Sequence, residues 1–283
     1  MKNLAAHPGE SQDTTFTLPQ HLDQNLSVKQ SAVLIAANFA NISQRFPLLS
    51  FELLPERVQT VISKPVNPTE VPRVTEYDVL CKIASAKKSK SVLPGDLPKR
   101  LLQQLPAQLA KPATAIFNNI INSGDWASQW KVEYVTPVAK VKTPETEDDL
   151  RNISLTNFLS KVFEKFVLEW LLIFIGDQID PGQYGGAKGS SISHYLIDLM
   201  NFVHYNQDLD PSHAVLATMI DYSKAFNNQN HNILITILSD MGVPTWFLKI
   251  VMGFLKNRSM ILRYRGECSS PKELFSVCSY FSS

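Results

Sequence analysis

The sequence has little of several features that mark specialised protein classes. Its 283 residues include only three cysteines, Cys81, Cys268 and Cys278, and none stand in the CxxC spacing of a zinc or redox site. The formal net charge is +1, so no global positive field points to nucleic acid, and any such binding needs local patches. Scarce cysteine favours reduced thiols over a disulfide framework, so we expect an intracellular protein of the cytoplasm or nucleus.

Long hydrophobic runs are missing too. The longest apolar stretch, residues 166–176, is interrupted by Glu169 and is shorter than the ~20 residues of a membrane span. The start lacks the pattern of a signal peptide, and no repeat recurs at solenoid periods. We therefore expect no membrane partner. The composition, 44% hydrophobic and 19% charged, is typical of a globular protein with one large or two moderate domains.

Helical and strand patterns are mixed along the chain. Residues 1–25 predict a flexible leader, and residues 26–74 predict a helical extension, starting at Ser27, followed by a proline-rich connector. Helical periodicity recurs over residues 75–86, 113–122, 156–175, 191–205, 231–241 and 244–254. Strand patterns cover residues 132–141, with Pro137 at an edge or bulge, and residues 215–220, 260–265 and 274–277. We therefore expect an α+β fold in which strand 215–220 pairs antiparallel with residues 260–264 or 274–277.

The helix predicted over residues 156–175 has the clearest apolar stripe. Ser160, Lys161, Glu164, Lys165 and Glu169 fall mostly off that stripe. The sequence therefore predicts that these polar side chains face away from the core that the helix covers.

Asp221 follows the predicted strand 215–220 directly. A carboxylate at the end of a buried strand is costly unless it is paired, hydrogen-bonded or bound to a cation. Phe226 comes five residues later and Asn227 follows it, with His231 opening the next helix. Taken alone, Asp221 is better interpreted as a cap of the following helix.

Basic side chains form local groups. Arg151 opens a strand-like segment shortly after Lys140, and a guanidinium can bind a phosphate through two parallel hydrogen bonds. Without further context, such an arginine is more often a surface ion-pair partner. A second basic group, Lys87, Lys88 and Lys90, lies near a predicted helix end. A third, Arg263 and Arg265, alternates along a predicted strand.

Five segments in order carry a family resemblance. They are the lysine-rich stretch 87–98, the W-K…V-x-P-V-x-K pattern of residues 130–140, R-N-I-S-L at 151–155, the Gly-rich stretch 183–191, and residues 214–231 around Asp221. Together they resemble the reverse transcriptases of non-LTR (LINE-like) retrotransposons. The resemblance implies a right-hand polymerase fold, with a fingers-like region over residues 75–212 and a partial palm over residues 213–283.

The resemblance also implies roles for individual residues. Asp221 and the backbone carbonyl of Tyr222 would bind catalytic Mg²⁺, and Phe226 would lie under the sugar and exclude ribonucleotides. The triphosphate of a deoxynucleotide would meet Lys140 and Arg151, while His231 would orient its loop without proton chemistry. An RNA template and DNA primer would contact Lys87, Lys88, Lys90, Arg263 and Arg265. The implied activity is that of an RNA-directed DNA polymerase.

Two motifs of that family, G-V-P-Q-G and x-D-D, do not occur in the sequence, so we expect these 283 residues to be a truncated domain that is inactive by itself. A first alternative is a non-catalytic remnant that binds nucleic acid, or another partner, through residues 82–100 and 258–265. A second is a magnesium-dependent phosphatase with Asp221 as nucleophile. It is disfavoured because Ser223 stands where that class needs a second acid.

Overall fold

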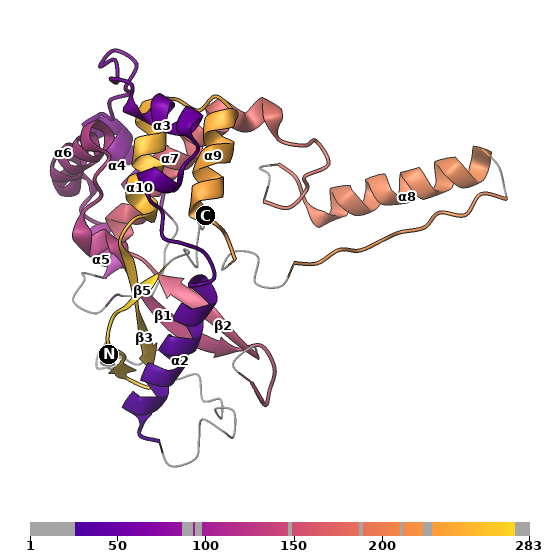
Figure 1. Ribbon diagram of the computed structural model, residues 1–283, viewed down its shortest axis with the longest axis horizontal. Coiled ribbons are helices and arrows are strands. Elements are labelled where there is room, and N and C mark those ends of the chain that lie inside the picture. Colours follow the sequence, from indigo (N-terminus) through magenta and orange to yellow (C-terminus); the bar gives the residue numbers. More distant parts are fainter. Residues whose placement is uncertain are drawn as a thin grey trace, which may run out of the picture. The chain divides into compact units, whose positions relative to one another are not determined.

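The computed structural model describes residues 26–86, 93, 98–146, 149–186, 189–209, 212–222 and 228–274 (Figure 1). The chain divides into two compact units. The first comprises Met1–Glu169 with Lys224–Ser283, and the second comprises Trp170–Ser223. The predicted leader, residues 1–25, lies outside the described residues.

A mixed five-stranded sheet forms one layer of the first unit. Its strands are β1 (Val132–Ala139), β2 (Leu150–Leu155), β3 (Arg258–Tyr264), β4 (Glu267–Cys268) and β5 (Lys272–Leu274). The order is β2-β1-β3-β4, and β5 also pairs with β3. β1 and β2 form an antiparallel hairpin, whereas β1 and β3 run parallel. Together with the helices, this sheet confirms the predicted α+β class; fingers and palm, with boundaries at residues 75, 212 and 213, stay predictions.

Pro137 lies inside β1, opposite Asn152 of β2. On the other side of β1, the pairing with β3 ends at Val135, so Pro137 has no partner residue in β3. Because proline has no N–H, it is tolerated where no ladder bond is needed.

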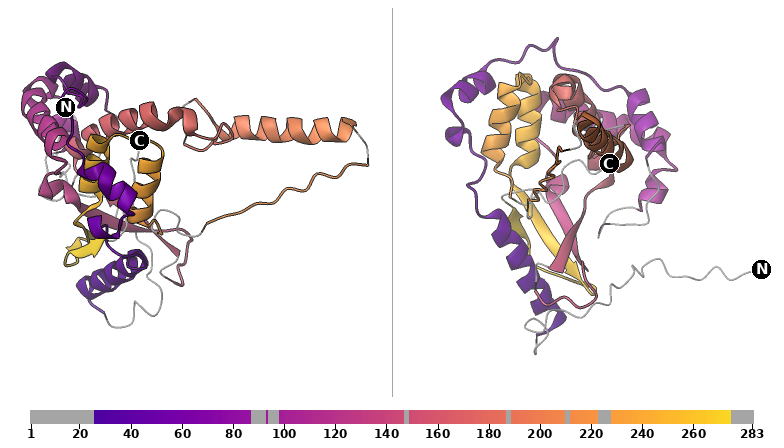
Figure 2. Two further views of the ribbon diagram at one scale, coloured as in Figure 1. Left: turned by 45° about the horizontal axis from the view of Figure 1, so that its top comes forward. Right: turned by 90° about the vertical axis from the view of Figure 1, so that its right-hand side faces the viewer.

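Helix α2 (Val28–Ser43) covers one face of the sheet (Figure 2). Its start is fixed by a capping box, in which the Ser27 hydroxyl accepts from the Gln30 N–H and the Gln30 side chain accepts from the Ser27 N–H. The helix and the sheet share one hydrophobic core, which includes Ala32, Ile35, Phe39, Val135, Leu262 and Tyr264. The helix predicted from Ser27 is confirmed.

The other helices of the first unit are α3 (Glu56–Ser63), α4 (Glu76–Ala84), α5 (Lys99–Leu102), α6 (Pro106–Ser123), the first part of α7 (Phe158–Ile175), α9 (His231–Asp240) and α10 (Thr245–Leu255). Short 3-10 turns occur at Phe51–Leu53 and Ser128–Lys131. Aromatic rings join these helices: Phe117 stacks on Phe163 with ring centroids 5.0 Å apart, and Trp126 meets Phe254 edge-on at 4.9 Å. Burying such large rings supplies much of the apolar driving force for this layer.

Two glycines set the closest approach between α6 and α10. Gly124 ends α6 at φ 77°, a left-handed conformation that suits glycine. A Cβ built on Gly253 of α10 would lie 1.8 Å from the carbonyl oxygen of Gly124. The backbones therefore meet at a distance that no side chain at position 253 allows.

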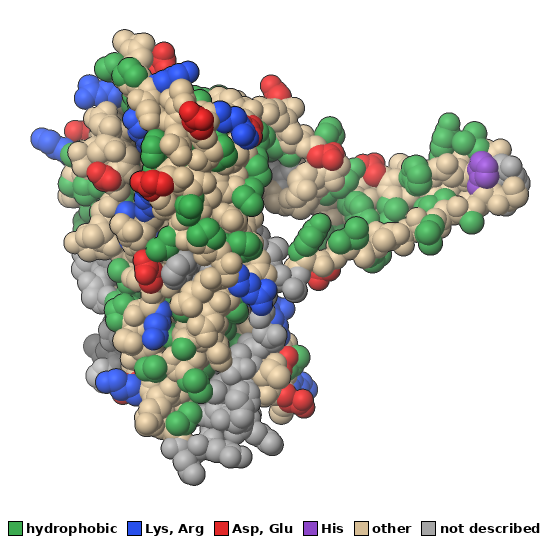
Figure 3. All heavy atoms as spheres, viewed as in Figure 1, with side chains coloured by type: hydrophobic (Ala, Val, Ile, Leu, Met, Phe, Trp, Pro, Cys, Tyr) green, Lys and Arg blue, Asp and Glu red, His purple; other side chains and the backbone are tan. Residues whose placement is uncertain are grey.

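The second unit contains the end of α7, a 3-10 turn at Gly176–Gln178, helix α8 (Ile192–Leu209) and the irregular chain 212–222. No α8 residue whose side chain is described is buried. Apolar side chains are exposed along both the helix and the irregular chain (Figure 3).

The strand predicted over residues 215–220 is wrong. These residues have no strand pairing in the described structure, and Leu216, Met219 and Ile220 are exposed. An apolar run becomes a strand only when another strand pairs with it, and the described part of the second unit offers none. Of the two expected partners, residues 260–264 pair instead with β1, β4 and β5. In the other, Leu274 pairs with Arg258 of β3, and residues 275–277 lie outside the described residues.

The helix ends were more predictable. Thr75 caps α4, where its hydroxyl and the Asp78 carboxylate form a capping-box variant. Across the described residues, no helix combines the length and the apolar character needed to cross a membrane.

Candidate functional site

The β1–β2 hairpin places Lys140 and Arg151 on one face of the sheet. Arg151 is the register partner of Val138, and paired residues of antiparallel strands point to the same face. Lys140 comes two residues after Val138, and its N–H donates to the Asp149 carbonyl at 2.7 Å, which continues the ladder. Both side chains are exposed.

Arg263 of β3 lies on this same face. The opposite face carries the buried residues Val135 and Leu262, which pack under α2. Because strand side chains alternate, Arg263 points away from α2, and it is partly exposed. The open face of the sheet, defined here by Lys140, Arg151 and Arg263, thus carries three cationic side chains from three strands or strand ends.

The turn of the hairpin is fixed by Asp149. Its Oδ2 accepts from the backbone N–H groups of Thr146 and Glu145, at 3.0 and 2.9 Å. These bonds hold the pKa of Asp149 below its usual value, with smaller contributions that include the Lys140 charge. The carboxylate therefore stays charged and keeps the hairpin closed beside Lys140.

Asp221 and Tyr222 belong to the second unit, where both are exposed in irregular chain. The predicted site residues Phe226, Lys87, Lys88 and Lys90 lie outside the described residues. The structure thus brings together Lys140, Arg151 and Arg263 on one sheet, and describes Asp221 in a separate unit.

A magnesium site is not completed by the residues described. Among them, no group of three histidine, cysteine or acidic side chains is placed to hold a metal ion. Mg²⁺ is usually bound through one or two carboxylates together with substrate phosphates. Asp221 could supply one such ligand.

The basic segment 258–265 separates into residues of different character. Arg265 is exposed at φ 44°, with its guanidinium 5.2 Å from the Tyr264 ring centroid. Arg258 is buried, with 2% of its surface exposed. Arg258 therefore cannot belong to an exposed binding patch, which corrects the extent of the surface predicted over residues 258–265.

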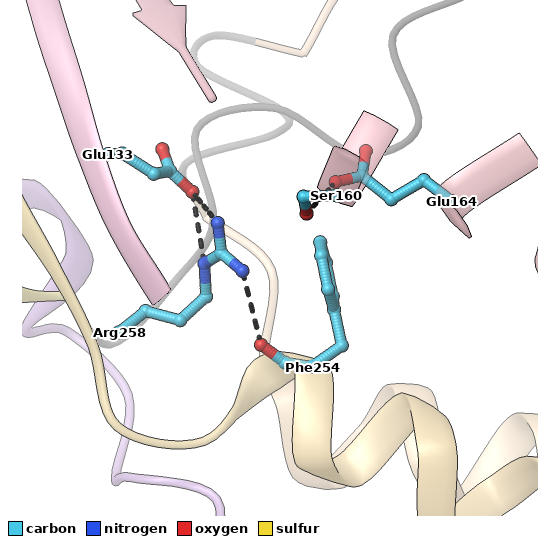
Figure 4. Close-up of polar contacts among 5 residues, drawn as sticks. All are labelled: Glu133, Ser160, Glu164, Phe254 and Arg258. Atoms are coloured by element: carbon cyan, nitrogen blue, oxygen red, sulfur yellow. Dashed lines mark hydrogen bonds and ion pairs between the residues drawn. The ribbon is translucent and has the colours of Figure 1, made fainter. Parts of the chain in front are cut away.

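The buried polar cluster around Arg258 was not predicted from the sequence (Figure 4). The guanidinium donates twice to Oε1 of Glu133, from Nε at 3.0 Å and from Nη2 at 2.6 Å. Its Nη1 donates to the Phe254 carbonyl at 3.4 Å. Oε2 of Glu133 is buried and finds no hydrogen-bond partner among the described residues. Glu133 and Arg258 each belong to a strand in which a charged residue would be expected to face solvent. The parallel pairing of β1 with β3 brings the two residues together in the interior.

The Ser160–Glu164 pair of α7 adds to this cluster and corrects a second prediction. Both residues were expected off the buried stripe, yet both are buried, and the Ser160 hydroxyl donates to Glu164 at 2.8 Å. Burial raises the pKa of Glu164, while Ser160 and then Arg258 oppose that shift. His231 at the start of α9 is also buried, and burial followed by the Arg258 charge lowers its pKa to about 4. His231 is therefore neutral at pH 7.

Comparison with known proteins adds independent information. No family model matches the chain. The chain is 25% identical over 214 residues to the probable RNA-directed DNA polymerase from transposon BS of Drosophila melanogaster, covering 75% of this chain and 23% of that protein. It is 26% identical over 242 residues to the RNA-directed DNA polymerase from mobile element jockey of the same organism, covering 83% and 26%.

A third relative is the probable RNA-directed DNA polymerase from transposon X-element of Drosophila melanogaster, 24% identical over 251 residues, with 84% of this chain and 26% of that protein covered. The chain thus spans about a quarter of the length of the relatives it matches. The matches support the resemblance derived from the motifs: the chain contains a region similar to the RNA-directed DNA polymerases of retrotransposons.

Proposed function

We propose that the chain is part of a reverse-transcriptase domain, and that the open face of its sheet binds the triphosphate of an incoming deoxynucleotide. The observation that carries this proposal is the placement of Lys140 and Arg151 on one exposed face of the β1–β2 hairpin. That face belongs to a chain similar to polymerases of mobile elements.

The two cations suit a triphosphate in different ways. A guanidinium forms a planar fork that can make two hydrogen bonds to one phosphate, whereas an ammonium acts as a point charge on a flexible stem. Arg151 would therefore orient one phosphate of the triphosphate, and Lys140 would neutralise the charge of the adjacent phosphate. Arg263 and Arg265, from β3 and the turn after it, would contact the template or primer backbone.

The remaining assignments belong to the same proposal. Asp221, with the Tyr222 carbonyl, would bind Mg²⁺, and Phe226 would select deoxyribose. The proposed substrates are an RNA template, a DNA primer and deoxynucleotides. Nucleotidyl transfer of this kind uses two metal ions, and the resemblance assigns only Asp221 as a carboxylate ligand within these 283 residues. We therefore propose that this chain alone does not extend a primer.

Nucleotide binding tests the central residue directly. A fluorescent deoxynucleotide triphosphate should bind the chain in the presence of Mg²⁺, and Arg151→Gln should weaken binding roughly tenfold, as expected for a lost charge-assisted hydrogen bond. Arg151→Lys should fall in between, because it keeps the charge and loses the fork.

Arg45→Gln is the matched control, since Arg45 is another exposed arginine of the first unit, in the loop after α2. Equal losses in Arg45→Gln and Arg151→Gln would mean non-specific attraction and would favour the alternative of a non-catalytic remnant. If nucleotide binding is insensitive to Arg151, the assignment of the open face is wrong.

A further inference from the structure

A second cationic surface of the first unit lies where α5 meets α7. The Lys99 ammonium, at the start of α5, stands 5.6 Å from the ring centroid of Phe158 at the start of α7. Lys161 and Lys165 follow Phe158 by three and seven residues, which puts all three on one side of the helix. Lys99 of α5 and two lysines of α7 are therefore close enough for the charges of Lys161 and Lys165 to act on Lys99.

Like charges repel at this surface, and no direct ion pair relieves them among the described residues, although the Lys161 charge acts on buried Glu164 and opposes the rise of its pKa. Lys161 and Lys165 are spaced i, i+4, an arrangement in which equal charges destabilise a helix. Burial and the charges of Lys161 and Lys165 lower the pKa of Lys99. Among the described residues, none of the three ammonium groups has a carboxylate oxygen within 4.0 Å.

The two acidic residues of this stretch of α7 are engaged elsewhere. Glu164, between the two lysines in sequence, is buried and bonded to Ser160. Glu169 forms an ion pair with Lys82 of α4. The fold thus gathers three partly buried cations, while the direct contacts of the nearby carboxylates go to Ser160 and Lys82. An anion from outside the chain would complete the charge balance of such a surface.

We propose that Lys99, Lys161 and Lys165 form a binding site for the phosphodiester backbone of a single-stranded nucleic acid. Lysine presents a flexible point charge without the fork that fits one phosphate, so three lysines recognise a line of charges rather than a defined group. Contacts of this kind position a strand without reading its bases. The choice of nucleic acid among polyanions rests on the proposed function; the anion site itself does not.

The test measures binding of a labelled ribo-oligonucleotide of roughly twelve nucleotides by fluorescence anisotropy, without nucleotide or Mg²⁺, across a salt series. Replacing Lys99, Lys161 and Lys165 together by glutamine should weaken binding roughly tenfold or more at low salt. The plot of log K against log salt should also become less steep by about 2, because each of three lost phosphate contacts contributes about 0.7 to the slope. The control replaces Lys29, Lys64 and Lys111, three exposed lysines of the first unit, by glutamine and removes the same charge.

Thermal unfolding provides a second readout. Because the site variant relieves repulsion, its Tm should stay equal to that of the parent chain or rise. A lower Tm, or equal binding losses in the site and control variants, would overturn the proposed site. Inorganic tripolyphosphate serves as competitor: if the site variant loses affinity for tripolyphosphate but not for the oligonucleotide, the backbone assignment is wrong. None of these results depends on Arg151, so failure here leaves the proposed nucleotide site standing.

Discussion

The buried pair Glu133–Arg258 gives the strongest stability prediction. Glu133→Gln keeps the shape of the side chain but leaves the guanidinium of Arg258 buried without its counter-charge. Removing one partner of a buried ion pair costs about 3–5 kcal/mol. Since a domain of this kind is stable by only about 5–15 kcal/mol, the variant should lose a large share of its free energy of unfolding.

Replacing both partners should cost much less. In Glu133→Leu/Arg258→Met neither member of the pair is left as an unpaired buried charge, and apolar replacement of a buried pair is often neutral or stabilising by about 1–4 kcal/mol. The parent here also leaves Oε2 of Glu133 buried without a partner among the described residues, so the replacement removes that cost too. Urea unfolding of Glu133→Leu, Arg258→Met and the double variant, followed by circular dichroism, gives the coupling energy.

The exposed pair Arg57–Asp240 is the matched control. It has the same chemistry, with Nη2 and Oδ2 2.9 Å apart, but both side chains are at least half exposed. Solvent screens such a pair, so Asp240→Asn should leave the urea midpoint nearly unchanged. If Glu133→Gln costs no more than Asp240→Asn, or if the double variant loses the sum of the single losses, the reasoning about this cluster is refuted.

Two further predictions concern packing and pH. Gly253→Ala should destabilise the chain by at least about 1–3 kcal/mol, because its Cβ would overlap the Gly124 carbonyl. The control in thermal unfolding is Gly176→Ala, which has open space around its Cβ. Equal Tm values for the two variants would contradict the close approach of the backbones. His231 has a folded pKa of about 4 against 6.5 for the free side chain, so the unfolded chain takes up the proton first. Stability should therefore be complete above about pH 6.5 and fall as pH drops toward 4, and His231→Gln should flatten that decline in urea midpoints; an unchanged pH profile would contradict it.

Local signals made much of the first unit predictable. The caps at Ser27, Thr75 and Gly124 act within one helical turn, so sequence alone indicates where α2 and α4 start and where α6 ends. The hairpin that carries Lys140 and Arg151 is also local, since β1 and β2 are neighbours in the chain and one turn fixes their register.

Long-range pairing could not be read from the sequence. The apolar run 215–220 has the composition of a buried strand, but β1, more than a hundred residues before β3, pairs with β3 instead. The same parallel pairing buries Arg258 against Glu133, two charged residues whose local patterns predict exposure. The burial of Ser160 and Glu164 was missed for a related reason. Polar residues beside an apolar stripe can be buried when they form hydrogen bonds with one another, as these two do.

RNA-templated primer extension in the presence of Mg²⁺ tests the central claim most directly. It is measured for the 283-residue chain alone and for the chain joined to the segment that follows the matched region in the jockey polymerase. We predict no extension by the chain alone, extension by the joined protein, and loss of that extension in Asp221→Asn. Extension that survives Asp221→Asn, or robust extension by the chain alone, would contradict the assignment of this chain as one part of a reverse-transcriptase domain built around Asp221.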